Sequence, residues 1–481
     1  MLLYWAEWRR RLTCVLAAVV LAGSCLASAR GEEAERVLQA GAAMVDISPP
    51  IGESVVGGFA PFPAARIHDP LHARCLVLDD GRTRIALVIC DNLGVIREVY
   101  DEARKLIGEQ TNVPPENILM AATHTHSGTR ARSDKYRPTV VRGIAEAVRL
   151  AESNLEPARI GWGGIDEPSE VFNRRWFVSD PQLRNNPFGG VDEVRMNPPR
   201  GGAALVKPAG PVDPEISFVS VQSQDGRPIA LLANYSLHYV GGVEKGDVSA
   251  DYFGIFSHRI GELLGAKKQD DKPAFVGMLS NGTSGDVNNI NFRERGRRYD
   301  PYEKMNEVAQ LVAQRVKEAH ADVEFHDWVP LGSAHRELTL KYRKPDEALK
   351  KYVAEIQAKP ADAPQHHRYE KNYADRVQRL LEGPDELTFP LQAIRIGDLA
   401  IAAIPFEVFT EIGLEIKEKS PFDDAFTIEL ANDYNGYLPT PRQHKLGGYE
   451  TWMGTNRVQL DASERITKVV LELMDELKSS K

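Results

Sequence analysis

The stretch His72-Ala-Arg-Cys-Leu-Val-Leu-Asp-Asp-Gly-Arg-Thr-Arg-Ile-Ala-Leu-Val-Ile-Cys90 has the sequence of a β-hairpin. Its apolar runs, 72–78 and 83–90, flank an Asp-Gly pair, which is a strong signal for a tight turn between antiparallel strands. A helical stretch from about 95 to 110 and an apolar strand, 117–123, come next. Because a strand reached through a helix needs a crossover connection, the segment predicts a mixed sheet covered by helices.

The same order of hairpin, helix and strand occurs twice more in the chain. The second copy turns at Asp225-Gly226 and the third at Gly397-Asp398. The predicted elements are 216–222, 229–235, 251–264 and 274–279 in the second copy, and 391–396, 399–404, 407–419 and 425–430 in the third. We therefore predict an α/β fold with a mixed sheet covered by helices, built from three related hairpin-helix-strand units.

Residues 1–29 have the pattern of a signal peptide. Arg9-Arg10-Arg11 precede an apolar run, 12–26, and Ala27-Ser28-Ala29 offers a small-residue cleavage site. The apolar run is too short to span a bilayer comfortably, and no other stretch predicts a transmembrane helix. We expect export to a periplasm or out of the cell, with lipid attachment at Cys25 as the less favoured alternative.

Residues 30–481 are expected to form one domain. Within it, 346–386 has the composition of a peripheral helical segment with a solvated face, and 177–208 is rich in Pro, Gly, Asn and Arg, as in a long loop. Loops of that length inside a domain often cover a functional site. The sequence gives no prediction of the oligomeric state.

Charge and cysteine content exclude two classes of protein. The net charge of −9 at pH 7 argues against a nucleic-acid partner and against a generally basic, membrane-adsorbing surface. Cys75 and Cys90 could be cross-strand neighbours or two buried free thiols, so stability does not depend on a disulfide framework. A small-molecule or lipid substrate remains as the expected partner.

Two histidines follow the predicted strand 117–123. His124 and His126 stand one residue apart, and in a strand such side chains point to the same face, within reach of one metal ion. Neutral imidazole is the commonest protein ligand for zinc, and Ser127-Gly128 predicts a turn that leaves the pair at a sheet edge. The alternative is that one ring is buried and hydrogen-bonded while the other is solvated.

Other polar residues also cluster where predicted strands end, and ligand sites in such sheets lie beyond the carboxyl ends of the strands. These positions are Asp91-Asn92, His238, 281–289, Glu407 and 432–437. A catalytic zinc site needs about three protein ligands and an open position. His238 and Glu407 are candidates to complete one; the alternatives are a structural histidine and a carboxylate at a helix N-terminus.

Thr123-His-Thr-His-Ser-Gly128 resembles the central motif of the neutral/alkaline non-lysosomal ceramidases, zinc amidases that hydrolyse the N-acyl bond of ceramide. The resemblance covers most of residues 38–460. Other segments match that family's motifs in order: Asp91-Asn-Leu-Gly94, Phe172-Asn-Arg174, Val212-Asp-Pro214, His238, Pro405-Phe-Glu407, Asn432-Asp-Tyr-Asn-Gly-Tyr-Leu-Pro-Thr440 and Tyr449-Glu450.

The resemblance implies a function and a set of site residues. Zinc would be bound by four residues: His124, His238, Glu407 and Tyr437. Three more would face the substrate amide or its oxyanion: His126, Arg174 and Tyr449. The implied activity is amide hydrolysis by a zinc-activated water, because zinc polarises a carbonyl and lowers the pKa of bound water.

Two departures from the family pattern bear on the substrate. Asn288 stands where the family has a serine implicated in catalysis, so an acyl-serine route is excluded there, and the family's C-terminal β-sandwich is not expected here. In addition, Arg130 and Arg132 replace a Gly-rich stretch after the histidine motif. The alternatives are therefore a zinc hydrolase of another acylated, polar substrate, held by arginines that include Arg174 and Arg175, and a non-catalytic binding protein that kept the fold.

Overall fold

Buried strands form the centre of the fold, in a sheet of eight. The structure is a computed structural model that describes residues 36–58, 60–360 and 362–480, so the predicted signal peptide lies outside the described residues. Residues 38–481 form one unit. The strand order in this unit is β16 (Val276–Asn281), β14 (Pro228–Tyr235), β13 (Glu215–Ser223), β8 (Glu156–Asp166), β1 (Gln39–Asp46), β5 (His72–Asp79), β6 (Arg84–Cys90) and β7 (Ile118–Ala122).

A second sheet covers one face of the first. Its order is β18 (Leu331–Lys341), β19 (Glu386–Ile396), β20 (Leu399–Ile404) and β22 (Asp424–Glu429). Side chains alternate along each strand, so Leu76 and Leu78 of β5 pack with Ile394 and Ile401 between the sheets. Ala73, Cys75 and Val77 of β5 point instead into the apolar layer on the opposite face. Strands buried on both faces explain the long apolar runs in the sequence.

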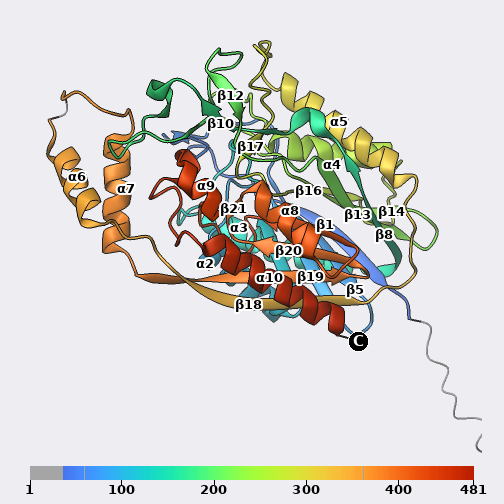
Figure 1. Cartoon of the computed structure of the whole chain (residues 1–481). Coiled ribbons are helices and arrows are strands. Elements are labelled where there is room, and N and C mark those ends of the chain that lie inside the picture. The colour runs from blue at the N-terminus through green and yellow to red at the C-terminus, as the bar shows by residue number, and fades with distance from the viewer. Residues whose placement is uncertain (1–35, 59, 361, 481) are drawn as a thin grey trace, which may run out of the picture. The chain divides into compact units, whose positions relative to one another are not determined.

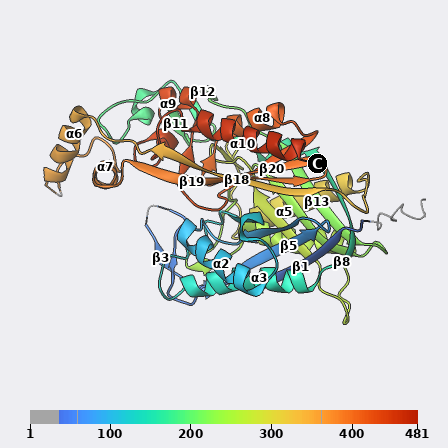
Figure 2. The ribbon, with the colours of Figure 1, turned by 90° about the horizontal axis from the view of Figure 1, so that it is seen from below.

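Helices cover the two outer faces, which makes four layers within residues 38–481 (Figure 2). The large sheet carries α2 (Arg97–Gln110), α3 (Arg137–Ser153), α4 (Asp251–Leu263) and α5 (Glu303–His320). The small sheet carries α8 (Thr410–Lys419) and α10 (Ala462–Ser479). In α10, Ile466, Val470, Leu473 and Leu477 recur at helical spacing and pack on that sheet.

Three antiparallel pairs are each followed by a helix and a parallel strand. They are β5 and β6 before β7, β13 and β14 before β16, and β19 and β20 before β22. The first two groups share the large sheet, whereas the third lies in the small sheet, so the predicted single sheet is two sheets. The mixed α/β class is as predicted.

Segments outside the layers correct one expectation. The predicted loop 177–208 contains a small sheet of β10 (Arg175–Val178), β11 (Val194–Met196) and β12 (Leu205–Pro208). The predicted peripheral segment contains α6 (Glu347–Ala358) and α7 (Glu370–Glu382), which lie at one end of the small sheet (Figure 1). Shorter elements are β2 (Ser54–Val55), β3 (Phe62–Pro63), β4 (Arg66–Ile67), β9 (Phe172–Asn173), β15 (Asp247–Val248), β17 (Val287–Asn288), β21 (Glu407–Val408), β23 (Tyr437–Leu438) and α9 (Pro441–Leu446).

Two further observations concern the cysteines and the helices. Cys75 and Cys90 are both buried free thiols, which decides between the two alternatives that the sequence left open. Within the described ranges, every helix is too short or too polar to cross a lipid bilayer.

Candidate metal centre

Three histidines converge beyond the carboxyl ends of β7 and β14. Nitrogens of His124, His126 and His238 lie within 4.8 Å of one another, and the Nε2 atoms of His124 and His126 are 3.1 Å apart. The predicted strand conformation at the pair is wrong: β7 ends at Ala122, and His124 has a φ of 69°. This left-handed backbone costs about 1–2 kcal/mol, and such strain is characteristic of functional sites.

The hydrogen bonds of the three rings fix their orientation. Each Nδ1 lies against a backbone oxygen: Leu93 O at 2.5 Å from His124, Gly57 O at 2.6 Å from His126, and Ser284 O at 3.1 Å from His238. Because a carbonyl oxygen only accepts hydrogen bonds, each Nδ1 carries a proton, and in a neutral ring the Nε2 then offers a lone pair. Backbone carbonyls orient metal-binding histidines in this way.

Burial favours the neutral form of two of these rings, His126 and His238. Burial, and after it the neighbouring His124, lowers the pKa of His126 and of His238 well below the usual histidine value. The Nε2 atoms of His124 and His126 face each other, and two nitrogens that both lack a proton cannot form a hydrogen bond. A cation held at the Nε2 of His124 would also be stabilised by the neighbouring lone pair, so the donor set fits a metal ion.

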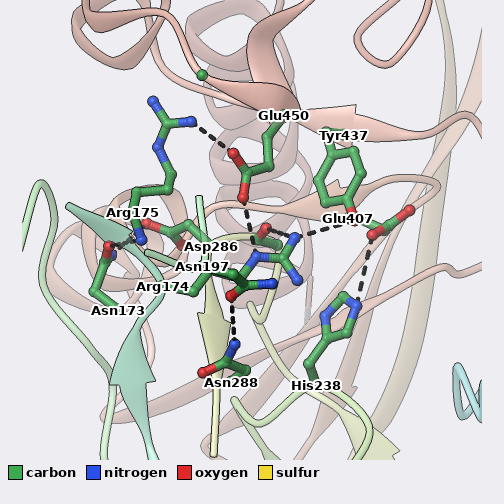
Figure 3. A network of polar contacts seen from close by, with 12 residues as sticks. Asn173, Arg174, Arg175, Asn197, His238, Asp286, Asn288, Glu407, Tyr437 and Glu450 are labelled. Atoms are coloured by element: carbon green, nitrogen blue, oxygen red, sulfur yellow. Dashed lines mark hydrogen bonds and ion pairs between the residues drawn. The ribbon is translucent and has the colours of Figure 1, made fainter. Parts of the chain in front are cut away.

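Glu407 faces the same centre. Its Oε2 is 3.5 Å from His124 Nε2. The same oxygen is 3.9 Å from His238 Nε2 (Figure 3). Among the described residues, neither Glu407 Oε2 nor His238 Nε2 has a hydrogen-bond partner, although both are buried. Two ligands of one tetrahedral zinc ion are about 3.3 Å apart. The spacing and the two unpartnered atoms therefore fit a metal ion.

The environment of Glu407 favours its ionised form. Burial alone would raise the pKa, but His124, Tyr437 and Arg174 outweigh burial and lower the pKa of Glu407 to about 2. Its Oε1 accepts a hydrogen bond of 2.8 Å from Tyr434. The carboxylate is thus fixed at one oxygen and free to bind a cation at the other.

Tyr437 reaches the centre because β21 pairs in parallel with β23, which sets Glu407 beside Tyr437. The expectation that Glu407 begins a helix is wrong, since α8 starts three residues later at Thr410. Arg174 donates a hydrogen bond of 3.0 Å to the Tyr437 hydroxyl. Burial raises the pKa of Tyr437 well above its usual value, so a phenolate here would require a bound cation.

Arg174 is held by a buried ion-pair network. Its Nε donates to Glu450 at 2.9 Å and its Nη2 to Gly285 O at 2.8 Å, while Arg175 pairs with the second Glu450 oxygen at 2.7 Å (Figure 3). One carboxylate thus joins two buried guanidinium groups. The network therefore fixes the orientation of the Arg174 guanidinium group beside Tyr437.

Glu450→Gln is expected to destabilise the fold, because it leaves the charges of Arg174 and Arg175 buried without a carboxylate. The expected loss in the free energy of unfolding is about 3–5 kcal/mol, measured by urea titration. Glu146→Gln is the matched control, because Glu146 pairs with Arg149 on the surface of α3. It should cost less than about 1 kcal/mol. Equal effects of the two variants would contradict the role of the network.

His126 and Tyr449 line the pocket that opens onto the centre. The pocket has a volume of about 650 Å³. The His126 ring stacks on Tyr239 at 3.6 Å between centroids, and the Tyr449 ring is 5.8 Å from that of Tyr437. Burial raises the pKa of Tyr449 to about 12, so it is a hydrogen-bond donor at neutral pH.

Asn288, which stands at the position of the family's serine, and the nearby Ser284 form hydrogen bonds with other residues. Asn288 donates to Asn197 Oδ1 at 2.8 Å and accepts from the Ile290 amide at 3.0 Å. Ser284 donates to Glu429 at 2.7 Å and lies 3.1 Å from His238 Nδ1, on the side of the ring away from Nε2. Both side chains therefore support neighbouring groups.

Five residues of the site and its pocket were not predicted from the sequence: Tyr434, Tyr239, Glu429, Arg376 and Arg379. Tyr434 stands three residues before Tyr437 in the quoted motif, and Tyr239 directly follows His238, so proximity was their only signal. Arg376 and Arg379 line the pocket from α7, in the segment predicted to be peripheral.

Comparisons with known proteins agree with this architecture. Residues 38–297 match the family model of the N-terminal domain of neutral/alkaline non-lysosomal ceramidase. Two curated relatives from Dictyostelium discoideum are neutral ceramidase B, 25% identical over 269 residues, and neutral ceramidase A, 24% identical over 221 residues. These alignments cover 52% and 42% of this chain but 35% and 28% of the relatives, about a third of their length.

Solved structures show the same fold. The crystal structure of neutral ceramidase from Pseudomonas aeruginosa matches with a TM-score of 0.68 at 18% identity. The match covers 92% of this chain and 75% of that one. A ceramidase complexed with C2 matches with a TM-score of 0.68 at 17% identity, over 92% of this chain and 76% of that one.

Proposed function

This chain belongs to the neutral/alkaline non-lysosomal ceramidase family, and on that premise we propose that it is an exported, zinc-dependent hydrolase of N-acyl amide bonds. The observation that carries the proposal is the convergence of three histidine nitrogens within 4.8 Å at the end of a pocket. Export rests on the leader-like sequence of residues 1–29 alone. N-terminal sequencing of the secreted or periplasmic protein tests that part.

We assign zinc binding to four residues: His124, His238, Glu407 and Tyr437. When bound, zinc supplies a Lewis acid that polarises the amide carbonyl and lowers the pKa of a water molecule. Backbone carbonyls hold the two histidines in the required tautomer, and Tyr434 holds Glu407. The positive charge of Arg174 lies beside Tyr437 and offsets the negative charge of the ligand set.

Three residues are assigned to the substrate. His126 is neutral, and its protonated Nδ1 is fixed by Gly57, so its Nε2 is available to accept a proton and return it to the leaving amine. Tyr449 is protonated and faces the pocket, so it can donate a hydrogen bond to the developing oxyanion. Arg174 adds a fixed positive charge to the same wall.

The experiment is hydrolysis of a fluorescent N-acyl sphingosine by the purified mature chain, with zinc measured on the same sample. We expect one zinc per chain, loss of turnover after chelation and its return when zinc is added. Turnover that persists in the chelated, metal-free protein would refute zinc dependence. Zinc without turnover on any amide would favour the binding-protein alternative.

Asn288→Ala is expected to retain activity, because the proposed nucleophile is water and Asn288 is held by Asn197 and Ile290. Loss of one such hydrogen bond costs about 1 kcal/mol, so kcat should fall by less than about tenfold. Steady-state kinetics with thermal unfolding as the control checks this. Complete loss of turnover in a folded variant would contradict the water route.

A further inference from the structure

Arginines dominate the wall of the pocket. Its described lining residues include six arginines, namely Arg130, Arg132, Arg174, Arg376, Arg379 and Arg457, but only one carboxylate. That carboxylate is Glu407, which faces the candidate metal centre. The excess of positive charge in this pocket contrasts with the net charge of −9 of the whole chain. A concave site with one sign of charge concentrates ligands of the opposite sign.

Three of these arginines have no acidic partner. Among the described residues, no carboxylate oxygen lies within the 4.0 Å of an ion pair from the guanidinium group of Arg130, Arg132 or Arg457. Arg132 is exposed and Arg130 and Arg457 are half-buried, whereas the guanidinium group of Arg174 is buried and is neutralised by Glu450. The Nε of Arg130 is buried and has no hydrogen-bond partner. These donors are therefore available to a ligand.

The three groups lie close together beside the metal centre. The Arg130 guanidinium sits 5.2 Å from the centroid of the Tyr434 ring, whose hydroxyl binds Glu407. Burial, then the charges of Arg130 and Arg457, lowers the pKa of Arg132, so the three positive charges repel one another. The nearby carboxylate of Glu98 opposes this only weakly. A bound anion would relieve the repulsion.

The loop that carries two of the arginines is fixed in place. Ala131 between them is buried and has a left-handed φ of 51°, and its amide donates to Thr129 Oγ1 at 3.1 Å. Thr129 in turn donates to Asn92 at the end of β6, at 3.2 Å. A strained and anchored loop between two arginines is a preorganised site, in which binding loses little conformational entropy.

We propose that the substrate of this site is an N-acyl amide with an anionic group on its amine portion, a carboxylate or a phosphate, which Arg130, Arg132 and Arg457 bind. Guanidinium groups bind both anions through paired, charge-assisted hydrogen bonds. The aliphatic side chains among the described lining residues are limited to Val56, Leu93, Met196, Leu380 and Pro384, which offer little contact to two long aliphatic chains. The proposal rests on the proposed hydrolase function and specifies its substrate class.

The test uses the zinc-loaded mature chain and three amides with the same acyl chain. They are N-dodecanoyl-ethanolamine, which is neutral, N-dodecanoyl-glycine, a carboxylate, and N-dodecanoyl-phosphoethanolamine, a phosphate. We expect kcat/KM for one anionic amide to exceed that for the neutral amide by about tenfold or more, as loss of a charge-assisted hydrogen bond implies. The better of the two anionic amides identifies the group.

Arg132→Gln should lower that preference ratio about tenfold, mainly through KM. Arg149→Gln is the matched control, because Arg149 is exposed on α3 and paired with Glu146, and its ratio should equal that of the wild type. If Arg132→Gln fails to fold in a thermal scan, Arg132→Lys, which keeps the charge but loses the paired geometry, takes its place with a smaller expected loss.

The outcomes separate the inference from the function on which it rests. Cleavage with no preference for the anionic amides, or an unchanged ratio in Arg132→Gln, overturns the inference and leaves the hydrolase function standing. If no amide is cleaved, the proposed hydrolase function is refuted. Titration calorimetry with dodecyl phosphate and with N-dodecanoyl-glycine then tests whether the arginines bind an anion. Saturable binding that Arg132→Gln weakens at least about tenfold supports the site, and equal binding by both proteins overturns it.

Discussion

Replacing His238 with alanine is expected to abolish zinc binding and amide hydrolysis together. His238 is buried, its Nδ1 is fixed by Ser284, and its Nε2 points without a hydrogen-bond partner toward Glu407. Removal of one of four proposed ligands should lower zinc affinity by at least the 10–100-fold that mutation of outer-shell partners costs. Zinc per chain by atomic spectroscopy, with kcat/KM on the same sample, measures both effects.

His258→Ala is the matched control for His238→Ala. His258 lies on α4 with its side chain 82% exposed, so its loss should change neither zinc content nor rate. A folded His238→Ala protein that retains stoichiometric zinc would refute the ligand set. Loss of activity with zinc retained would instead assign His238 to the reaction and not to the metal.

Replacing His126 with alanine is expected to lower kcat while the protein keeps its zinc. His126 is half-buried in the wall of the pocket, whereas His124 and His238 are almost fully buried. Loss of a group that transfers protons lowers kcat by about 10²–10⁴-fold. We therefore expect one zinc per chain and a KM within a few-fold of wild type.

The opposite result would also be informative, since His126 belongs to the group of three histidines that could hold a metal. Zinc loss in His126→Ala equal to that in His238→Ala would make His126 a ligand and would contradict its assignment to proton transfer. Equilibrium dialysis against a zinc buffer at fixed pH distinguishes the two cases, because it measures affinity and not only content.

The α/β class could be predicted because strands buried on both faces have long apolar runs. The run from Ile85 to Cys90 and the Asp80-Gly81 turn are local features, and local features are visible in a sequence. The division into two sheets was not predictable. It depends on the pairing of β18 with β19, whose register joins Leu331 to Ile396 across 65 residues.

The candidate site shows the same limit. The His124 and His126 pair was visible as a motif, but the turn with a positive φ at His124 was not, because a positive φ is uncommon for any residue other than glycine. The resemblance named Tyr437, yet its place beside Glu407 depends on the parallel pairing of β21 with β23, two strands of two residues each. No periodicity can be detected in so short a strand.

The arginine-lined wall shows what only a tertiary structure reveals. Arg130 and Arg132 were noted as cations after the histidine motif, but Arg457 comes from a segment more than 300 residues away. All three line one pocket, in which the Arg130 guanidinium lies 5.2 Å from the centroid of the Tyr434 ring. The sequence supplied the charges, and the fold determines that they act on one ligand.

The most direct test of the metal centre is anomalous X-ray scattering from crystals of the mature protein at energies on either side of the zinc absorption edge. The account predicts one strong anomalous peak, present only above the edge, bonded to His124 Nε2, His238 Nε2, Glu407 Oε2 and the Tyr437 hydroxyl. Ligand distances should be about 2.0–2.2 Å. A zinc-soaked crystal with no peak there, or with its zinc at other residues, would contradict the account.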